Sequence, residues 1–396
     1  MSGFQRVVLL VLDGVGIGAL PDAALYGDEQ AATLPHVAEA VGGIELPQLQ
    51  TLGIGNVCVI PGVPAQKVPQ ACWGRMAECS AGKDSVTGHW ELMGLQRRNP
   101  FATYPQGFPE EIVSKFERLA GCRPLGNCAA SGTEILDALG EEHLASGRPI
   151  VYTSSDSVFQ IAAHEELLAP QALYDLCRRT LEMVAPFGIC RVIARPFVGR
   201  RRGNFRRTSR RHDFPVPPGG TTLLDLCQAS GVPTCGIGKI GDLFAGRGLD
   251  RSLPTKSNRE GMAILGEVLK EQRRGLIFAN LVDFDMLYGH RCDAEGFAVA
   301  LADFDRCLID LMAGLAATDL LLITADHGCD PTTAGTDHCR EYVPLLAWSP
   351  TLDQGVSLGV RASFADVGAT LAEIFALSLD CGNSFLSALS GCESAA

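Results

Sequence analysis

The sequence predicts an α/β protein with a mostly parallel sheet flanked by helices, and two observations support this fold class. The first is a set of short, continuous apolar runs, which suit parallel strands buried on both faces. These runs span residues 7–12, 150–153, 190–194, 234–238, 276–282 and 320–324. The second is a set of stretches with helical spacing between the runs: 110–119, 134–144, 172–184, 222–229, 260–272 and 297–315. Strands that alternate with helices indicate a parallel sheet.

Two stretches rich in proline and glycine divide the chain. They span residues 97–109 and 215–220, and we interpret both as linkers because these residue types interrupt regular structure. The segment between them has its own strand and helix pattern. The sequence therefore predicts a core made of residues 1–98 and 219–396, with a smaller α/β cap domain, residues 99–218, inserted into it.

The composition is that of an ordinary globular protein. The 396 residues are 46% hydrophobic and carry a formal net charge of −12, which argues against general binding to nucleic acids. The fifteen cysteines are scattered without a C-x-x-C pair, which favours reduced thiols in the cytoplasm. We expect neither a signal peptide nor a membrane span, because the apolar runs are too short. The oligomeric state is left open, and a monomer is compatible with the sequence.

Carboxylate and imidazole side chains follow several of the predicted strands. The six residues are Asp13, Asp285, His290, Asp326, His327 and His338. Ligands of parallel sheets bind beyond the carboxyl ends of the strands, so we expect these side chains to form one site. A buried structural histidine explains any single imidazole, but it explains three imidazoles with matching aspartates less well. Mixed oxygen and nitrogen ligands indicate two divalent metal ions, with Mn²⁺ favoured over Zn²⁺, Fe²⁺ or Mg²⁺ alone.

The segment 82–91 offers two hydroxyl groups, on Ser85 and Thr87. A hydroxyl beside two metal ions is a competent nucleophile, and this combination indicates phosphoryl transfer. We expect a helix to begin near Gly88, with its positive end towards a bound phosphate. Asp84, Ser85 and Thr87 are also good helix N-caps, so the local pattern does not distinguish a cap from a nucleophile.

Motifs spread over the chain point to one enzyme family. They are VLDGVGIG at 11–18, GKDS at 82–85, TGHWE at 87–91, YTSSDSV at 152–158, RVIARPF at 191–197, RHD at 211–213, GIGKI at 236–240, NLVDFD at 280–285, YGHR at 288–291 and GTDH at 335–338. With these motifs the sequence resembles the prokaryotic-type phosphopentomutases of the alkaline phosphatase-like superfamily. The resemblance covers nearly the whole chain and implies an alkaline phosphatase-like, metal-binding catalytic core.

The resemblance also implies an activity. The enzyme would be an isomerase that interconverts α-D-ribose 1-phosphate and D-ribose 5-phosphate, and the 2-deoxyribose forms, in nucleoside salvage. Phosphorylated Ser85 would donate its phosphoryl group to form a 1,5-bisphosphate, and ribose 1,5-bisphosphate or glucose 1,6-bisphosphate would act as activator. One Mn²⁺ would be held by Asp13, Asp326 and His327, and the other by Asp285, His290 and His338. A metal-dependent phosphatase or phosphodiesterase on the same core is the alternative.

The sequence departs from the family pattern at three positions. Ser85 stands where the family usually has threonine, so the methyl group that restricts rotation about χ1 is missing and Thr87 is a second candidate nucleophile. Cys329 stands where asparagine is usual, beside a predicted ligand pair. Cys292 stands where a basic residue is usual. We interpret Cys329 as a residue that packs against the ligands rather than as a ligand.

Nine arginines lie between positions 191 and 211 of this acidic chain. Guanidinium groups bind phosphate through paired hydrogen bonds, so we expect Arg195 and Arg207 to bind the phosphate of a small pentose phosphate. A solvated charged loop is the alternative, and we expect it for residues 200–202. Nucleic-acid binding by this cluster is disfavoured by the net charge. The resemblance places Ser154, Asp156 and Lys239 near the pentose or its phosphate.

Overall fold

The computed structural model describes residues 3–154 and 157–390. It divides the chain into two compact units. The larger unit is formed by residues Met1–Asn99 and Pro218–Ala396, and the smaller unit by Pro100–Pro217. The expected inserted segment, 99–218, differs from the smaller unit by one residue at each end.

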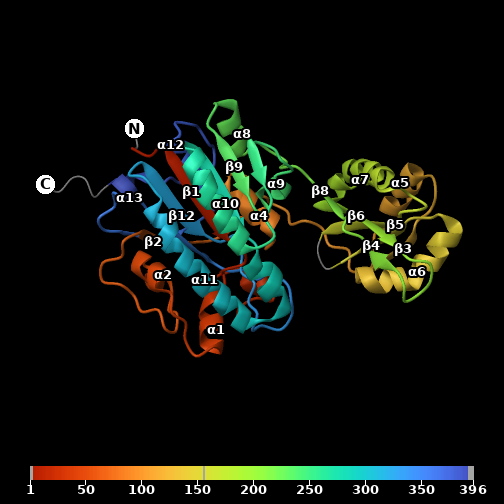
Figure 1. Ribbon diagram of the computed structural model, residues 1–396, viewed down its shortest axis with the longest axis horizontal. Helices are drawn as coiled ribbons and strands as arrows, with labels where there is room; N and C mark the ends of the chain where they lie inside the picture. The colour runs from red at the N-terminus through yellow and green to blue at the C-terminus, as the bar shows by residue number, and fades with distance from the viewer. Residues whose placement is uncertain (1–2, 155–156, 391–396) are drawn as a thin grey trace. The chain divides into compact units, whose positions relative to one another are not determined.

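The larger unit is built on an eight-stranded sheet within the described residues (Figure 1). In spatial order its strands are β10 (Arg251–Leu253), β9 (Thr234–Ile237), β11 (Gly275–Leu281), β1 (Arg6–Leu12), β12 (Asp319–Thr324), β13 (Val343–Trp348), β2 (Cys72–Met76) and β14 (Ser357–Arg361). Strand β13 pairs antiparallel with both of its neighbours, whereas the other pairs are parallel. The prediction of a mostly parallel sheet is confirmed.

The centre of this sheet is a group of three parallel strands, β11, β1 and β12. All their residues are buried, as expected for strands covered on both faces. Val11 of β1 pairs with Asn280 of β11 and with Thr324 of β12, so the three strands end at the same level. The loops that follow them therefore leave the sheet side by side.

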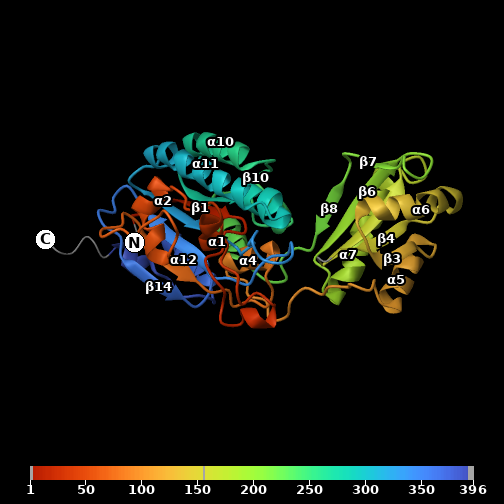
Figure 2. The ribbon, with the colours of Figure 1, turned by 90° about the horizontal axis from the view of Figure 1, so that it is seen from below.

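Helices cover both faces of the larger sheet. They are α1 (Thr33–Ala40), α2 (Pro47–Leu52), α3 (Ile54–Val57), α4 (Ser85–Leu92), α8 (Leu223–Ala229), α9 (Ile240–Leu243), α10 (Asn258–Glu271), α11 (Ala294–Ala313), α12 (Ala365–Ile374) and α13 (Leu386–Ser390). Helix α11 packs against α1, α2 and α10, and Figure 2 shows α10 and α11 side by side. Helix α4 packs against α9 and α12. No helix among the described residues is long and apolar enough to span a membrane.

The smaller unit has its own sheet and its own core. Its strands are β3 (Leu125–Ala129), β4 (Ile150–Thr153), β5 (Val158–His164), β6 (Arg191–Val198), β7 (Arg206–Arg207) and β8 (His212–Pro215). Helices α5 (Glu110–Ala120) and α7 (Pro170–Val184) lie on one side of this sheet and α6 (Gly132–Ser146) on the other (Figure 1). Phe116 and Phe159 belong to the core under α5 and α7, whereas Leu136 and Phe197 belong to the core under α6.

Candidate metal centre and nucleophile

Three buried carboxylates lie at the ends of the three central strands. Asp13 directly follows β1, and Asp326 follows β12 after one intervening residue. Asp285 lies in a π-helical turn, Phe284–Tyr288, that follows β11. Their exposed fractions are 0%, 0% and 3% respectively, so the strand register brings three negative groups together away from water.

Asp13, Asp326 and His327 form the first predicted ligand group. One ligand atom from each lies within 4.8 Å of the others. Nε2 of His327 is 3.4 Å from Oδ1 of Asp13 and 3.3 Å from Oδ2 of Asp326. Nδ1 of His327 lies 3.0 Å from the carbonyl oxygen of Gly328, to which it can donate. This contact leaves Nε2 facing the two carboxylates.

The second group centres on Oδ1 of Asp285. Nε2 of His290 lies 3.3 Å from this oxygen, and Nε2 of His338 lies 3.4 Å from it. Nδ1 of His290 can donate to the carbonyl oxygen of Thr336 at 2.6 Å. The His327 and His338 rings lie 4.0 Å apart between centroids, so the two groups are adjacent. The structure thus brings all six sequence-predicted ligands together.

Cys329 lies beside the second group. Its side chain is buried, and Sγ is 3.9 Å from Nδ1 of His290, the nitrogen that faces Thr336 rather than Asp285. Burial and the Asp285 carboxylate raise the pKa of the Cys329 thiol. The thiol also lies within 4.8 Å of ligand atoms of Asp285 and His290, so it stands directly beside this group.

The side chains at this site fit a metal. Among the buried side-chain atoms of the described residues, Oδ1 of Asp285, Oδ2 of Asp326 and Nε2 of His338 have no hydrogen-bond partner. A buried polar atom without a partner costs free energy, and cations held by the two groups would satisfy these atoms. Carboxylate oxygens and imidazole nitrogens are the donors that Mn²⁺ and Zn²⁺ accept.

The charged groups at the site shift one another's pKa values. Burial would raise the pKa of Asp13, but Lys239, with Nζ 2.9 Å from Oδ2, and His327 hold it well below its usual range. Burial would lower the pKa of His327, but Asp326 and Asp13 raise it well above its usual value. Lys239 was expected near the sugar; its ammonium lies between Asp13 and Asp285, 3.7 Å from Oδ2 of the latter.

The segment with the two candidate hydroxyls, residues 82–91 (the nucleophile segment), differs from the expectation in one respect. Helix α4 begins at Ser85 rather than near Gly88, because Asp84 is its N-cap and accepts from the backbone N–H of Thr87. Oγ1 of Thr87 also donates to Asp84 at 2.6 Å, and the Thr87 side chain is fully buried. Oγ of Ser85, in contrast, lies 3.0 Å from Nε2 of His327 and 3.4 Å from Oδ1 of Asp13. Ser85 is therefore the hydroxyl that faces the ligand groups.

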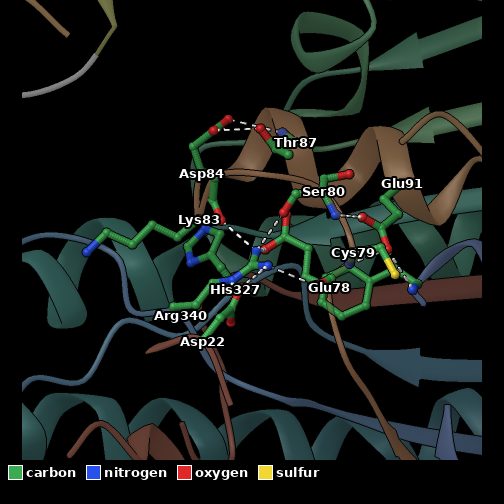
Figure 3. Close-up of polar contacts among 12 residues, drawn as sticks. Asp22, Glu78, Cys79, Ser80, Lys83, Asp84, Thr87, Glu91, His327 and Arg340 are labelled. Atoms are coloured by element: carbon green, nitrogen blue, oxygen red, sulfur yellow. Dashed lines mark hydrogen bonds and ion pairs between the residues drawn. The ribbon is translucent and has the colours of Figure 1, made fainter. Parts of the chain in front are cut away.

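Arg340 fixes the turn that leads to this helix. Figure 3 shows its guanidinium inside the turn, where it donates to Glu78 at 2.7 Å and to the carbonyl oxygens of Ser80 and Gly82 at 2.8 and 2.7 Å. Arg340 is 3% exposed and stands two residues after His338. It thereby links the loop between β12 and β13, residues 325–342 (the metal loop), to the nucleophile segment.

Glu91 holds the other end of helix α4. Its carboxylate accepts from the backbone N–H groups of Cys79 and Ser80 at 2.9 and 2.6 Å, and from Ser363 and Phe364. Sequence reasoning missed both Glu91 and Arg340. Their signal was a charged residue inside a motif that is otherwise buried, TGHWE for Glu91 and the stretch after GTDH for Arg340.

The predicted phosphate ligands of the smaller unit lie near Tyr152. Nε of Arg195 donates to Oε1 of Gln160 at 3.0 Å, and burial together with the neighbouring Arg211 lowers the pKa of Arg195. Arg207 is exposed, and both Arg195 and Arg207 lie close enough to influence the titration of the Tyr152 hydroxyl. These guanidinium groups form one positive cluster.

Several of the nine arginines are paired with carboxylates. Arg191 and Arg211 contact Asp213, Arg200 contacts Glu166, and Arg210 contacts Glu165. Residues 200–202 are exposed. Of the two predicted sugar contacts in this unit, Ser154 directly follows β4 and Asp156 lies outside the described residues.

The chain is similar to known proteins over nearly its whole length. The chain matches the family model of the Metalloenzyme superfamily over residues 5–379. The solved structure of the PH0037 protein from Pyrococcus horikoshii is similar, with a TM-score of 0.51 and 14% sequence identity, over 96% of this chain and 100% of that one. That likeness concerns the fold alone. The fold and the site together define a member of the Metalloenzyme superfamily, and the predicted fold class is confirmed.

Closer relatives identify the family. The phosphopentomutase of Syntrophotalea carbinolica is 58% identical over 386 residues, which cover 98% of each chain. The phosphopentomutase of Dictyoglomus thermophilum is 53% identical over 387 residues, 97% of this chain and 98% of the relative. The chain belongs to the phosphopentomutase family, a family of intramolecular phosphotransferases, and the resemblance deduced from the motifs is confirmed.

Proposed function

We propose that the protein interconverts α-D-ribose 1-phosphate and D-ribose 5-phosphate, and the 2-deoxyribose forms, through a phosphoenzyme on Ser85. The observation that carries the proposal is the position of the Ser85 hydroxyl, 3.0 Å from His327 and 3.4 Å from Asp13. Thr87, the other candidate, is held by Asp84. The family membership supports the reaction class.

The six ligands fit two divalent metal ions, for which we propose Mn²⁺. Asp13, Asp326 and His327 would hold one ion, and Asp285, His290 and His338 the other. Such ions lower the pKa of a bound hydroxyl and neutralise charge on a phosphoryl group. The N-terminal turn of α4, which begins at Ser85, adds backbone N–H groups that favour an anion at the same place.

In the proposed reaction, phosphorylated Ser85 transfers its phosphoryl group to the free hydroxyl of the pentose phosphate. The bond between phosphorus and Oγ of Ser85 breaks, a bond to the sugar oxygen forms, and the proton of the sugar hydroxyl passes to Oγ of Ser85. The resulting 1,5-bisphosphate returns its other phosphoryl group to Ser85. A bisphosphorylated sugar, ribose 1,5-bisphosphate or glucose 1,6-bisphosphate, would supply the first phosphoryl group.

The positive cluster of the smaller unit suits the binding of a phosphate group. Arg195 is held by Gln160, so its guanidinium is pre-oriented, and Arg207 adds a second positive group. Planar guanidinium groups bind phosphate with paired hydrogen bonds. We propose both as phosphate ligands, with Ser154, Asp156 and Lys239 contacting the pentose or its phosphate.

The test of this proposal is a product assay by ³¹P nuclear magnetic resonance. The full chain, with Mn²⁺ and a trace of glucose 1,6-bisphosphate, is given α-D-ribose 1-phosphate. We expect D-ribose 5-phosphate without matching release of inorganic phosphate. Release of inorganic phosphate without the second pentose phosphate would contradict the proposal and favour the phosphatase alternative.

The Ser85→Ala variant tests the nucleophile in the same assay. Removal of the hydroxyl is expected to lower turnover by roughly a thousandfold or more, because the step through the phosphoenzyme is lost. Thr87→Val is the matched control, since it removes the buried hydroxyl two residues away at a cost of about 1 kcal/mol of stability. Metal content should be unchanged in both variants, and retained turnover in Ser85→Ala would exclude Ser85 as the nucleophile.

A further inference from the structure

His89 links the nucleophile to a metal ligand. It lies one turn after Ser85 on α4 and is fully buried. Its Nδ1 donates to the carbonyl oxygen of Ser85 at 2.8 Å. The same nitrogen is 3.1 Å from Oδ2 of Asp326, the carboxylate oxygen that has no hydrogen-bond partner. One imidazole N–H therefore lies between the backbone of the nucleophile and the carboxylate of a predicted ligand.

The other side of the imidazole is also held. Nε2 lies 3.2 Å from Nδ2 of Asn280, a fully buried residue near the end of β11. The amide of Asn280 can donate to Nε2, while Nδ1 donates to the carbonyl oxygen of Ser85. The ring stacks on Phe278 of the same strand at 5.6 Å between centroids. The orientation of the ring is thus fixed on both edges and on one face.

The backbone of α4 touches Asp326 as well. A Cβ atom at Gly88 would overlap the carbonyl oxygen of Asp326, so glycine permits this close approach. On the far side of the carboxylate, the N–H of Gly14 donates to Oδ1 of Asp326 at 3.1 Å. Gly14 therefore donates to one oxygen of Asp326, and Nδ1 of His89 lies beside the other.

We propose that His89 is a positioning residue that fixes the position of Ser85 relative to the Asp326 carboxylate. The proposal rests on the proposed function of Ser85. Residues that orient metal ligands from outside typically change metal affinity or activity by 10- to 100-fold when they are replaced. A core histidine that only fills space would affect stability and leave metal binding unchanged.

Two substitutions separate these roles. Asparagine places an amide N–H near the position of Nδ1, whereas leucine fills similar space without a donor. In His89→Leu we expect Mn²⁺ affinity of the chelator-stripped full chain, measured by isothermal titration calorimetry, to fall by about 10- to 100-fold. In His89→Asn we expect most of that affinity to return. We also expect kcat for the pentose phosphate to fall in His89→Leu, with KM nearly unchanged.

His143→Leu is the matched control, because His143 is a buried histidine of the smaller unit with its own backbone partners. It should leave Mn²⁺ affinity at the wild-type value. If His89→Leu does not fold by circular dichroism, His89→Gln replaces it, since glutamine reaches the Asn280 side but offers no donor near Nδ1.

Wild-type Mn²⁺ affinity in His89→Leu, or in His89→Gln where it replaces the leucine variant, would overturn the proposal. An equal loss of affinity in that variant and in His89→Asn would overturn it too. These affinities are measured without turnover. A wild-type chain that binds Mn²⁺ but does not become phosphorylated on Ser85 would therefore contradict the proposed function. The comparison of Mn²⁺ affinities tests the role of His89 separately.

Discussion

At the scale of single residues, hydrogen bonding decides which hydroxyl is the nucleophile. Ser85 and Thr87 are equivalent in the sequence, since both are good cap residues within one short motif. In the structure the Thr87 hydroxyl donates to Asp84, whereas the Ser85 hydroxyl faces His327 and Asp13. The distinction depends on where α4 begins, and the local pattern did not determine that residue.

Glu341 gives a prediction at this scale. Burial raises the pKa of this carboxyl to about 7, although it accepts from Thr33 and from the N–H of Gly18. Because the folded chain then holds the proton more tightly than the unfolded chain, this group makes the free energy of unfolding fall as pH rises from 4.5 towards 7. The slope is at most about 1.4 kcal/mol per pH unit.

In Glu341→Gln this slope should disappear, because the amide does not titrate and still accepts from both backbone N–H groups. Urea denaturation at pH 5 and pH 7 in the presence of a chelator measures the effect. Glu373→Gln, at an exposed position, is the control and should keep the wild-type slope. An unchanged slope in Glu341→Gln would show that other groups cause it.

At the scale of elements, apolar runs located the strands well. The run 276–282 corresponds to β11, and the run 320–324 corresponds to β12. Each run is buried on both faces, so its hydrophobicity alone marks it. The start of α4 was wrongly predicted because several residues before Gly88 suit a cap, and tertiary contacts of Asp84 and Thr87 choose among them.

The close packing of α4 against Asp326, just beyond the end of β12, gives a prediction at this scale. Gly88→Ala would place a methyl group on the carbonyl oxygen of Asp326, so α4 or the metal loop must move. We expect a loss of about 1–3 kcal/mol in the free energy of unfolding and weaker Mn²⁺ binding. Gly266→Ala in α10, where a Cβ meets nothing within 4 Å, is the control and should be neutral or stabilising. Equal changes in the free energy of unfolding and in Mn²⁺ binding for the two variants would contradict the close packing of Gly88 against Asp326.

At the scale of the whole molecule, the six ligands come from distant parts of the chain. Asp13 and His338 are far apart in sequence, and only the order of β11, β1 and β12 brings their loops together. The sequence predicted that the ligands follow strands, and strand ends meet in a parallel sheet. It could not predict the contacts of Arg340, Glu91 or His89, because those depend on how α4 packs on this edge.

The crowded carboxylates predict that metal binding stabilises the fold. A metal ion that binds the folded chain but not the unfolded chain should raise the free energy of unfolding by about 2.7 kcal/mol when the free metal concentration is 100 times Kd. Thermal unfolding with increasing Mn²⁺ after chelator treatment measures this effect. In His338→Ala the stabilisation should be smaller, because one imidazole of the second group is lost. Stabilisation as large as in the wild type would exclude His338 from the ligands.

The central claim is that Ser85 carries the phosphoryl group, and peptide mass spectrometry tests it most directly. The full chain is incubated with Mn²⁺ and ribose 1,5-bisphosphate, digested, and the segment around residues 82–91 is sequenced by fragmentation. We predict one phosphate on Ser85 in the wild type and none in Ser85→Ala. A phosphate on Thr87, or no phosphate anywhere on the wild-type chain, would contradict the claim.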